Sequence, residues 1–212
     1  RVRGTCAVGG QAAGTAAAMA VAYGVTPREL GKAHIDELQQ TLLKDDCYIP
    51  GFANHDPADL CRTAQVTASS HKPGREPELV ISGVTRRVGN QENVWESHDL
   101  KDAELTLRLR EAAPVKQLRL TFDPNLTREI MPSMTRNVRD RQIKGLPLEL
   151  VKDYRAELLK DGQAVWSKDV FDNGQRLNVL ELESPVLCDT IRITVTAAHG
   201  YDAARIFEVR AY

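Results

Sequence analysis

The feature that most constrains this chain is an alternation of apolar and polar residues that begins near Ala64 and continues to the C-terminus. Leu105, Leu107 and Leu109 alternate with polar residues, and Arg205–Arg210 follows the same pattern. A period of two places one side of a segment in a core and the other in solvent, as in a β-strand. Segments of this kind occur at 65–70, 79–81, 105–109, 118–122, 154–160, 163–167, 177–182, 191–195 and 205–210.

Short turns, and no segments of helical length, separate these strands, so a parallel sheet with crossover helices is not expected. Asp161-Gly162 lies between two of them and suits the positive φ angles of a tight hairpin turn. The pattern predicts a mainly β fold, an eight-stranded antiparallel jelly-roll β-sandwich over 63–212, preceded by a small helical segment.

Residues 1–50 have the opposite character. An alanine-rich helix is predicted from an N-cap at Thr5 to Tyr23, where Gly24 would end it. The helix has almost no charge on any face, and Gly9, Gly10 and Gly14 belong to a ridge of small residues. A helix that is apolar all round is expected to be enclosed by another body.

A transmembrane interpretation of this helix is the alternative, because Gly10 and Gly14 have the spacing of a membrane packing pair. Gln11 and Thr15 interrupt the apolar run and large aliphatic residues are few, so the sequence does not favour a membrane span.

Two further helical signals follow. Thr26, Pro27 and Glu29 form a capping-box pattern, and a second helix is predicted over 33–44 with Ile35, Leu38, Leu42 and Leu43 on its apolar face. Residues 51–62 contain many helix breakers and are predicted to be a linker.

Charge and cysteine content exclude several classes of function. The 28 basic and 29 acidic residues give a net charge of -1, so a nucleic-acid partner is not expected. No pair of cysteines has C-x-x-C spacing, which argues against a zinc site. Free cysteines are favoured over a disulfide framework, with a Cys47–Cys61 bridge as the alternative in an oxidising compartment.

The connection Asp123–Pro147 is longer than a sandwich requires. After Asp123 it holds two acidic residues, Glu129 and Asp140, and five basic ones: Arg128, Arg136, Arg139, Arg141 and Lys144. Long loops without regular structure are commonly functional or interfacial. The loop either is a solvated connection, or docks on another part of the protein or binds an anion.

The segment 1–18, with Gly-Gln-Ala-Ala-Gly at its centre, resembles the closing motif of bacterial FAD-dependent oxidoreductases of the glutathione-reductase-like type, as do 26–30 and 34–39. The resemblance covers about the first 50 residues. It implies that the alanine-rich helix is the last helix of an FAD domain, with its N-terminal end facing the flavin. The residues placed near FAD are Thr5, Cys6, Gly10, Gln11 and Ala12.

The phosphate-binding G-x-G-x-x-G pattern is absent from the chain. The resemblance therefore implies a C-terminal fragment of a flavoprotein that has no redox activity alone and whose partner is a preceding FAD-binding part. Its start at Arg1 within a motif supports the same expectation. The expected localisation is periplasmic or secreted, and the catalytic residues remain unknown.

Segments of 64–212, among them 93–97, 118–123 and 204–208, resemble a galactose-binding-like domain of the discoidin or coagulation-factor type C kind. That resemblance implies loops at one end that bind sugars, and a structural calcium ion held with a late glutamate, Glu208. Trp95 and Trp166 are expected to be packing residues rather than sugar platforms.

Two functional interpretations follow. The main one is an accessory portion of a flavoprotein oxidoreductase, and the alternative is a carbohydrate-binding module of a polysaccharide-processing enzyme. A purely structural interaction domain is the third, since the fold alone does not decide function.

Overall fold

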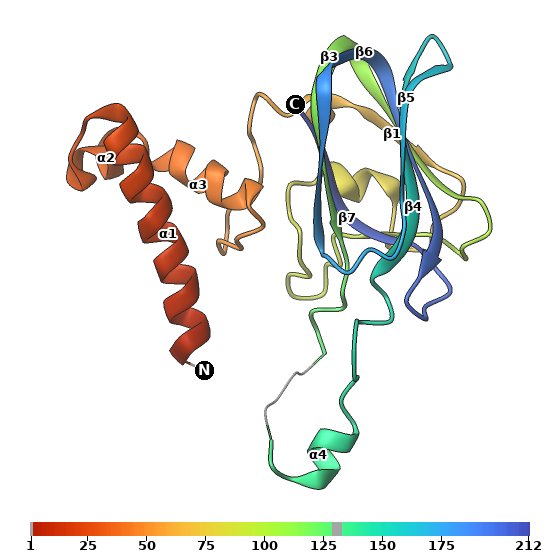
Figure 1. Cartoon of the computed structure of the whole chain (residues 1–212), viewed down its shortest axis with the longest axis horizontal. Helices are drawn as coiled ribbons and strands as arrows, with labels where there is room; N and C mark the ends of the chain where they lie inside the picture. Colours follow the sequence, from red (N-terminus) through yellow and green to blue (C-terminus); the bar gives the residue numbers. More distant parts are fainter. Residues whose placement is uncertain (1, 129–132) are drawn as a thin grey trace. The chain divides into compact units, whose positions relative to one another are not determined.

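A computed structural model describes residues 2–128 and 133–212 of the chain. It divides into a helical unit, Arg1–Asp56, and a β-sandwich unit, Pro57–Tyr212 (Figure 1). The division falls within the segment 51–62 that the sequence predicts to be a linker.

The helical unit contains three helices: α1 Val2–Tyr23, α2 Pro27–Ala33 and α3 Ile35–Lys44. The predicted start of α1 is wrong, because the helix already includes Val2 and Thr5 therefore lies inside it rather than at its N-cap. Its end is as predicted, since Gly24 follows with a φ of 65°, which a residue without a Cβ adopts without strain.

Most of α1 is exposed, and Ala20 is its one buried side chain among residues 3–23. A Cβ added at Gly9, Gly10 or Gly14 would meet nothing within 4 Å. The enclosure expected from the composition of α1 is thus not supplied by the described residues. No helix in 2–128 or 133–212 is long and apolar enough to cross a membrane.

Helices α2 and α3 agree with the capping and periodicity signals. The predicted capping box is confirmed: the Thr26 side chain accepts from the Glu29 backbone N–H, and the Glu29 carboxylate accepts from the Thr26 N–H at 2.8 Å. Leu38, Leu42 and Leu43 are buried as predicted. Ile35 is wrongly placed in that set, because it is 45% exposed at the first residue of α3.

The sandwich unit consists of antiparallel strands. Their bounds are β1 Gln65–Ala68, β2 Trp95–Glu96, β3 Ala103–Phe122, β4 Val151–Lys160, β5 Gln163–Val170, β6 Leu177–Ala198 and β7 Arg205–Ala211. The order is β2-β7-β3-β6-β4-β5, with β1 paired to β3. The predicted antiparallel sandwich is confirmed, although several predicted strands are halves of β3 and β6.

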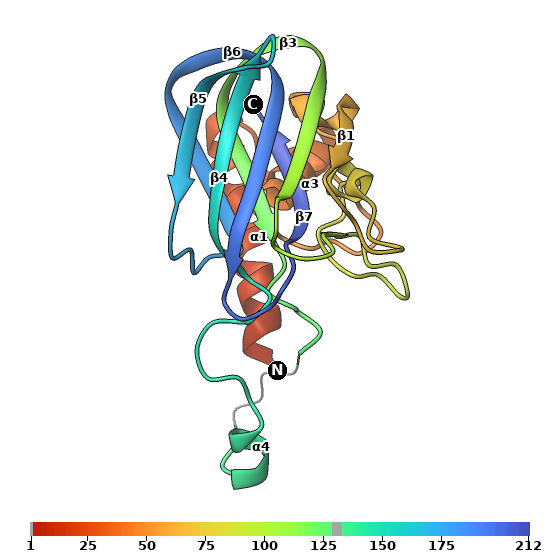
Figure 2. The same ribbon diagram turned by 90° about the vertical axis from the view of Figure 1, so that its right-hand side faces the viewer.

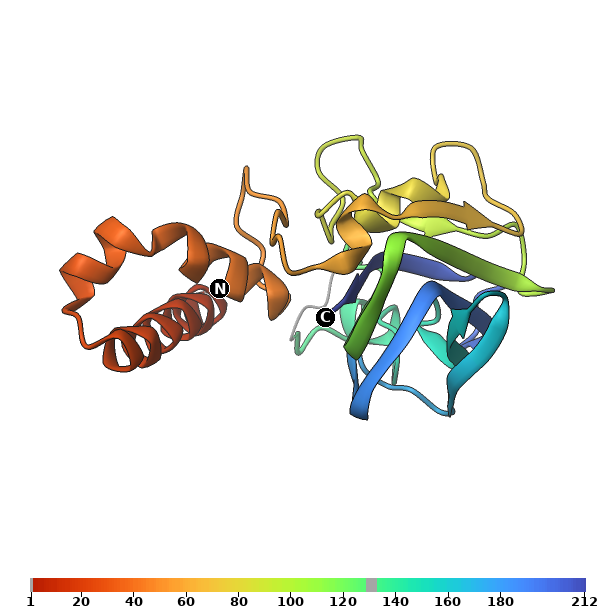
Figure 3. The same ribbon diagram turned by 90° about the horizontal axis from the view of Figure 1, so that it is seen from above.

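These two long strands each contribute to both layers of the sandwich. The first half of β3 pairs with β1 and the last part of β6, whereas its second half pairs with β7 and the first part of β6. A register shift between Arg108 and Ala113 marks the bend in β3. Figure 3 views the sandwich from the end where both strands bend.

The core lies between the two layers and follows the alternation in the sequence. Leu105, Leu107, Leu118 and Leu120 are fully buried together with Trp95. The Phe122 and Tyr154 rings pack edge to face with centroids 5.0 Å apart, which joins the two layers. The predicted packing role of Trp95 is confirmed, and Trp166 is partly buried against the same core.

The hairpin prediction is also confirmed, with φ of 51° at Asp161 and 78° at Gly162 between β4 and β5. The strand predicted at 79–81 is wrong. Pro77–Ile81 is a 3-10 helix, η2, that begins with a proline and buries Val80 alone among 79–81. Three apolar residues are too few for periodicity to separate a strand from a helical turn. The segment Leu60–Thr63 forms a second 3-10 helix, η1.

All four cysteines are free thiols, so the Cys47–Cys61 alternative is not observed. Cys61 and Cys188 are buried, whereas Cys6 is exposed. Burial raises the pKa of Cys188 to about 11 and holds the pKa of Cys61 well above its ordinary value, which keeps both thiols protonated and unreactive.

Candidate functional site at the loop end of the sandwich

The strand directions gather the long connections at one end of the sandwich. β3 ends there at Phe122, β4 begins there at Val151, and β7 begins there at Arg205. The connections 69–94, 123–150 and 199–204 therefore meet at this end, opposite the bends of β3 and β6 (Figures 1 and 2). We call it the loop end; long connections on a rigid scaffold are where binding residues are commonly placed.

A buried carboxylate organises the loop end. Glu96, in the short strand β2, is 3% exposed. Its Oε1 accepts from Lys72 Nζ and from the Tyr201 hydroxyl, both at 2.7 Å, and its Oε2 accepts from Arg205 Nη1. Burial alone would raise the pKa of Glu96, but these hydrogen bonds and the positive charge of Arg205 hold it below its ordinary value.

Arg205 extends the network to the end of β3. Its Nε donates to Asp123 Oδ2 at 2.8 Å, and Asp123 is itself buried. Asp123 Oδ1 in turn accepts from the backbone N–H of Asn125 at 2.7 Å, which fixes the first turn of the long connection. The network thus positions segments far apart in the sequence before any ligand binds.

The first cavity at the loop end has a volume of about 190 Å³, and we call it the polar cavity. Arg75 Nη1 donates to Glu92 Oε2 at 2.8 Å, and Arg87 Nη1 lies 3.5 Å from Glu92 Oε1. The carboxylate of Glu92 thus holds two guanidinium groups in one wall. The full lining is Arg75, Arg86, Arg87, Glu92, Asp123, Asn125, Leu126, Thr127, Arg205 and Phe207.

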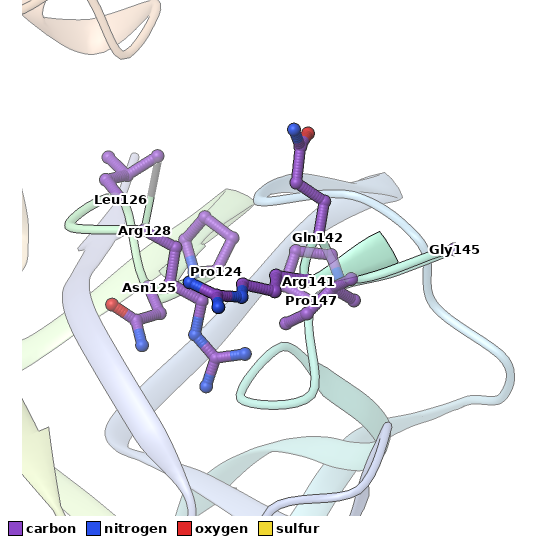
Figure 4. Close-up of a pocket in the computed structure, with 9 residues that line it drawn as sticks. Pro124, Asn125, Leu126, Arg128, Arg141, Gln142, Gly145 and Pro147 are labelled. Atoms are coloured by element: carbon purple, nitrogen blue, oxygen red, sulfur yellow. The ribbon is translucent and has the colours of Figure 1, made fainter. Parts of the chain in front are cut away.

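The second cavity has a volume of about 720 Å³ and is lined from both ends of the 123–147 connection; we call it the arginine cavity. Its charged lining residues are Arg128 and Arg141, beside apolar ones such as Pro124 and Ile143. Figure 4 shows the Arg141 side chain extended toward the Pro124–Arg128 side. A short helix, α4 Arg136–Asp140, lies between the two lining segments.

Glu149 supports the wall shared by the two cavities. It is buried, and its Oε1 accepts from Asn125 Nδ2 at 2.8 Å and from Arg128 Nη2. Asn125 and Leu126 line both cavities, so the two are neighbours across this segment.

Two aromatic residues of the loop end have exposed surface, and neither is a tryptophan. Phe171, directly after β5, is 75% exposed, and Tyr201 is partly exposed beside Lys72 and Arg205. The sequence analysis did not single out either residue. One signal could have identified Phe171: it is an aromatic residue at the end of an alternating strand, directly before the polar run Asp172-Asn173-Gly174.

Glu208, the predicted calcium ligand, lies in β7 and is buried. Its Oε2 accepts from Arg210 Nε at 2.7 Å, and a cation at this carboxylate would compete with that guanidinium. In 2–128 and 133–212 no three His, Cys, Asp or Glu residues group into a metal site. These contacts do not favour a calcium site. Calcium binding at Glu208 therefore stays an untested prediction.

The residues predicted to contact FAD all lie on α1, in the helical unit. Thr5, Cys6, Gly10 and Gln11 are exposed and Ala12 is partly exposed. They share one helix rather than a cavity, and neither cavity at the loop end includes any of them.

The loop Asp123–Pro147, for which the sequence leaves open a solvated connection or a docking or anion-binding role, lines the arginine cavity from both of its ends. Its Glu129 lies outside the described residues. The polar cavity was missed, because Arg75, Glu92 and Arg205 are far apart in the sequence and no spacing connects them.

Comparison with known proteins identifies the fold. No protein-family model and no curated protein matches the chain. Among solved structures, a fucose-binding module of Streptococcus pneumoniae superposes with a TM-score of 0.56 and 10% identity, over 73% of this chain and 96% of that one. The lectin domain of lectinolysin, complexed with Lewis B antigen, gives 0.54 and 13% over 72% and 94%. The family 32 carbohydrate-binding module of C. perfringens NanJ, complexed with galactose, gives 0.51 and 16% over 73% and 97%.

These findings correct the main functional interpretation of the sequence. The named neighbours are carbohydrate-binding modules, not flavoproteins, so they contradict the interpretation as a fragment of an FAD-dependent oxidoreductase. The resemblance behind it covered only about 50 residues, and its central motif lies in a helix rich in alanine and glycine, a composition that any small-sided helix can share. The larger unit of this chain has the galactose-binding-like β-sandwich fold, which it shares with family 32 carbohydrate-binding modules.

Proposed function

We propose that the sandwich unit is a carbohydrate-binding module that holds a glycan at its loop end, over the polar cavity. The observation that carries the proposal is the wall in which Glu92 holds Arg75 and Arg87 side by side next to Asn125 and Thr127. This wall presents donors and acceptors to one open cavity.

The chemistry of a sugar suits such a wall. Each hydroxyl donates one hydrogen bond and accepts others, so it can bridge a guanidinium donor and a carboxylate acceptor. Hydrogen bonds to charged groups are stronger than those between neutral ones. Because salt bridges already order the side chains, binding would require little further ordering of the protein.

Two features of the loop end add support. Phe171 and Tyr201 are aromatic residues with exposed surface at the same end of the fold. The fold's neighbours include modules that bind fucose, Lewis B antigen and galactose. A sandwich with loop-end cavities is thus compatible with sugar recognition, and the side chains decide which sugar.

The test is a glycan microarray probed with the full chain, followed by calorimetric titration of the best ligand. Glu92→Gln removes the charge that holds two arginines, and we expect it to weaken binding about tenfold, equivalent to about 1.4 kcal/mol. Glu183→Gln is the matched control, because Glu183 is exposed on β6 in its central, bent part, away from both cavities. Absence of any glycan binding, or equal weakening by both variants, would refute the proposal.

A further inference from the structure

We infer that the preferred glycan carries an anionic substituent, a carboxylate or a sulfate ester, which the arginine cavity receives through Arg128 and Arg141. This inference rests on the proposed function and names the chemical class of its ligand. Two observations support it: the positive charge of the residues that line the two cavities, and the wall that the two cavities share.

The loop-end cavities carry a positive excess that the chain as a whole lacks. Together their linings contain two acidic residues, Glu92 and Asp123, and six arginines. The arginines are Arg75, Arg86, Arg87, Arg128, Arg141 and Arg205. The whole chain has a net charge of -1, so the excess is local to this end.

Carboxylates behind the linings offset part of the excess. Glu96 accepts from Arg205, and Glu149 accepts from Arg128. The excess that matters for this inference lies in the arginine cavity, where Arg128 and Arg141 are the charged lining residues and Glu149 is the carboxylate seen to bind one of them among the described residues. Arg141 is exposed, and no ion pair to it is observed within 2–128 and 133–212. Nearby Lys144 adds a further positive charge to the same segment.

The two cavities are placed to take two parts of one ligand. They share the wall formed by Asn125 and Leu126, so a sugar in the polar cavity would direct a substituent across that wall. At about 720 Å³, the arginine cavity falls within the usual size range of small-molecule sites, larger than one hydroxyl requires.

The guanidinium group matches an anionic substituent in geometry as well as charge. Its planar fork donates two parallel hydrogen bonds to a carboxylate, and it is weakly hydrated compared with an ammonium group. Glu149 already holds Arg128 in place, so an arriving anion would meet one fixed and one extended arginine. A neutral sugar could accept hydrogen bonds from these guanidinium groups but would form no ion pair with them.

The experiment measures affinity for three matched probes: lactose, 3′-O-sulfolactose and 3′-sialyllactose. The microarray adds neutral glycans of other sugars, each beside its sulfated and its sialylated or uronate counterpart. At low ionic strength we expect the anionic member of the best series to bind at least tenfold more tightly than its neutral parent. The preference should fall as salt is added, because exposed charges are screened. The sulfate and carboxylate arms show which anion is preferred.

Arg141→Gln should bring the ratio of anionic to neutral affinity close to one, whereas Arg110→Gln should keep the wild-type ratio. Arg110 is the matched control because it is exposed at the bend of β3, the opposite end of the sandwich. Equal affinity for neutral and anionic members, or an unchanged ratio in Arg141→Gln, would overturn this inference while leaving sugar binding intact. Absence of binding to every glycan would overturn the proposed function as well.

Discussion

The two units of this protein bury their side chains in different ways. In the sandwich, strands distant in the sequence pair with one another, and Trp95, Leu105 and Phe122 are completely inaccessible to solvent. In the helical unit, the backbone hydrogen bonds are local, and α1 leaves Val21 84% exposed. A helix satisfies its backbone hydrogen bonds within itself and can therefore form without a core. A strand needs a partner strand for its backbone hydrogen bonds, so strand formation is tied to the packing of the sheet.

The first prediction tests whether the sandwich core carries most of the stability. Trp95→Ala removes a fully buried indole whose Nε1 donates to the Ser70 carbonyl at 3.0 Å. We expect the free energy of unfolding of the sandwich to fall by about 3–5 kcal/mol. Urea unfolding followed by near-ultraviolet circular dichroism would measure the change.

Val21→Ala in α1 is the control for this comparison. Val21 is almost fully exposed, so the same measurement should change by less than about 0.5 kcal/mol. A comparable loss in both variants would mean that the exposed helix contributes to stability as the core does, and the contrast between the units would fail.

The second prediction concerns the ionic network of the loop end. Glu96→Gln keeps the shape of the side chain but removes the charge that Lys72, Tyr201 and Arg205 surround. We expect a loss of about 1–3 kcal/mol in unfolding free energy at pH 7, because the remaining groups are buried with poorer partners.

The pH dependence of that loss gives a sharper test. The pKa of Glu96 lies below its ordinary value of 4.5 in the folded protein, so its stabilising effect is complete above about pH 4.5. It is lost as pH falls through the lower folded pKa. The stability difference between wild type and Glu96→Gln should therefore shrink as the pH falls below about 4.5, and a constant difference would contradict this assignment.

The third and smallest prediction concerns the helical unit. Thr26→Ala removes the cap of α2 and should cost about 1 kcal/mol locally. Hydrogen exchange in the full chain should show faster exchange at the Leu30 and His34 amides, which donate to the carbonyls of Thr26 and Leu30, respectively. Exchange in β3 and β6 should remain unchanged, and faster exchange there would show that the two units unfold together.

Local signals in the sequence were sufficient where the neighbouring residues decide the structure. Alternation located the strands, Asp161-Gly162 located the hairpin, and Thr26 with Glu29 located the start of α2. Three predictions were wrong for one reason: the N-cap at Thr5, the burial of Ile35 and the strand at 79–81. In each case the outcome depended on residues outside the short segment from which the prediction was made.

The functional interpretation divides in the same way. The small-sided composition of α1 suggested a flavin domain, but composition states what a helix can contact and not which partner it has. The second resemblance, carried by residues spread along 64–212, agrees with the fold of the solved structures.

The sequence by itself determined that this chain contains an antiparallel sandwich after a helical segment, because side-chain period and turn chemistry are local properties. Only the tertiary structure decided where the cavities lie, since strand pairing and loop packing that no short spacing encodes bring Arg75, Glu92 and Arg205 together in the polar cavity. The same packing brings Arg128 and Arg141 together in the arginine cavity.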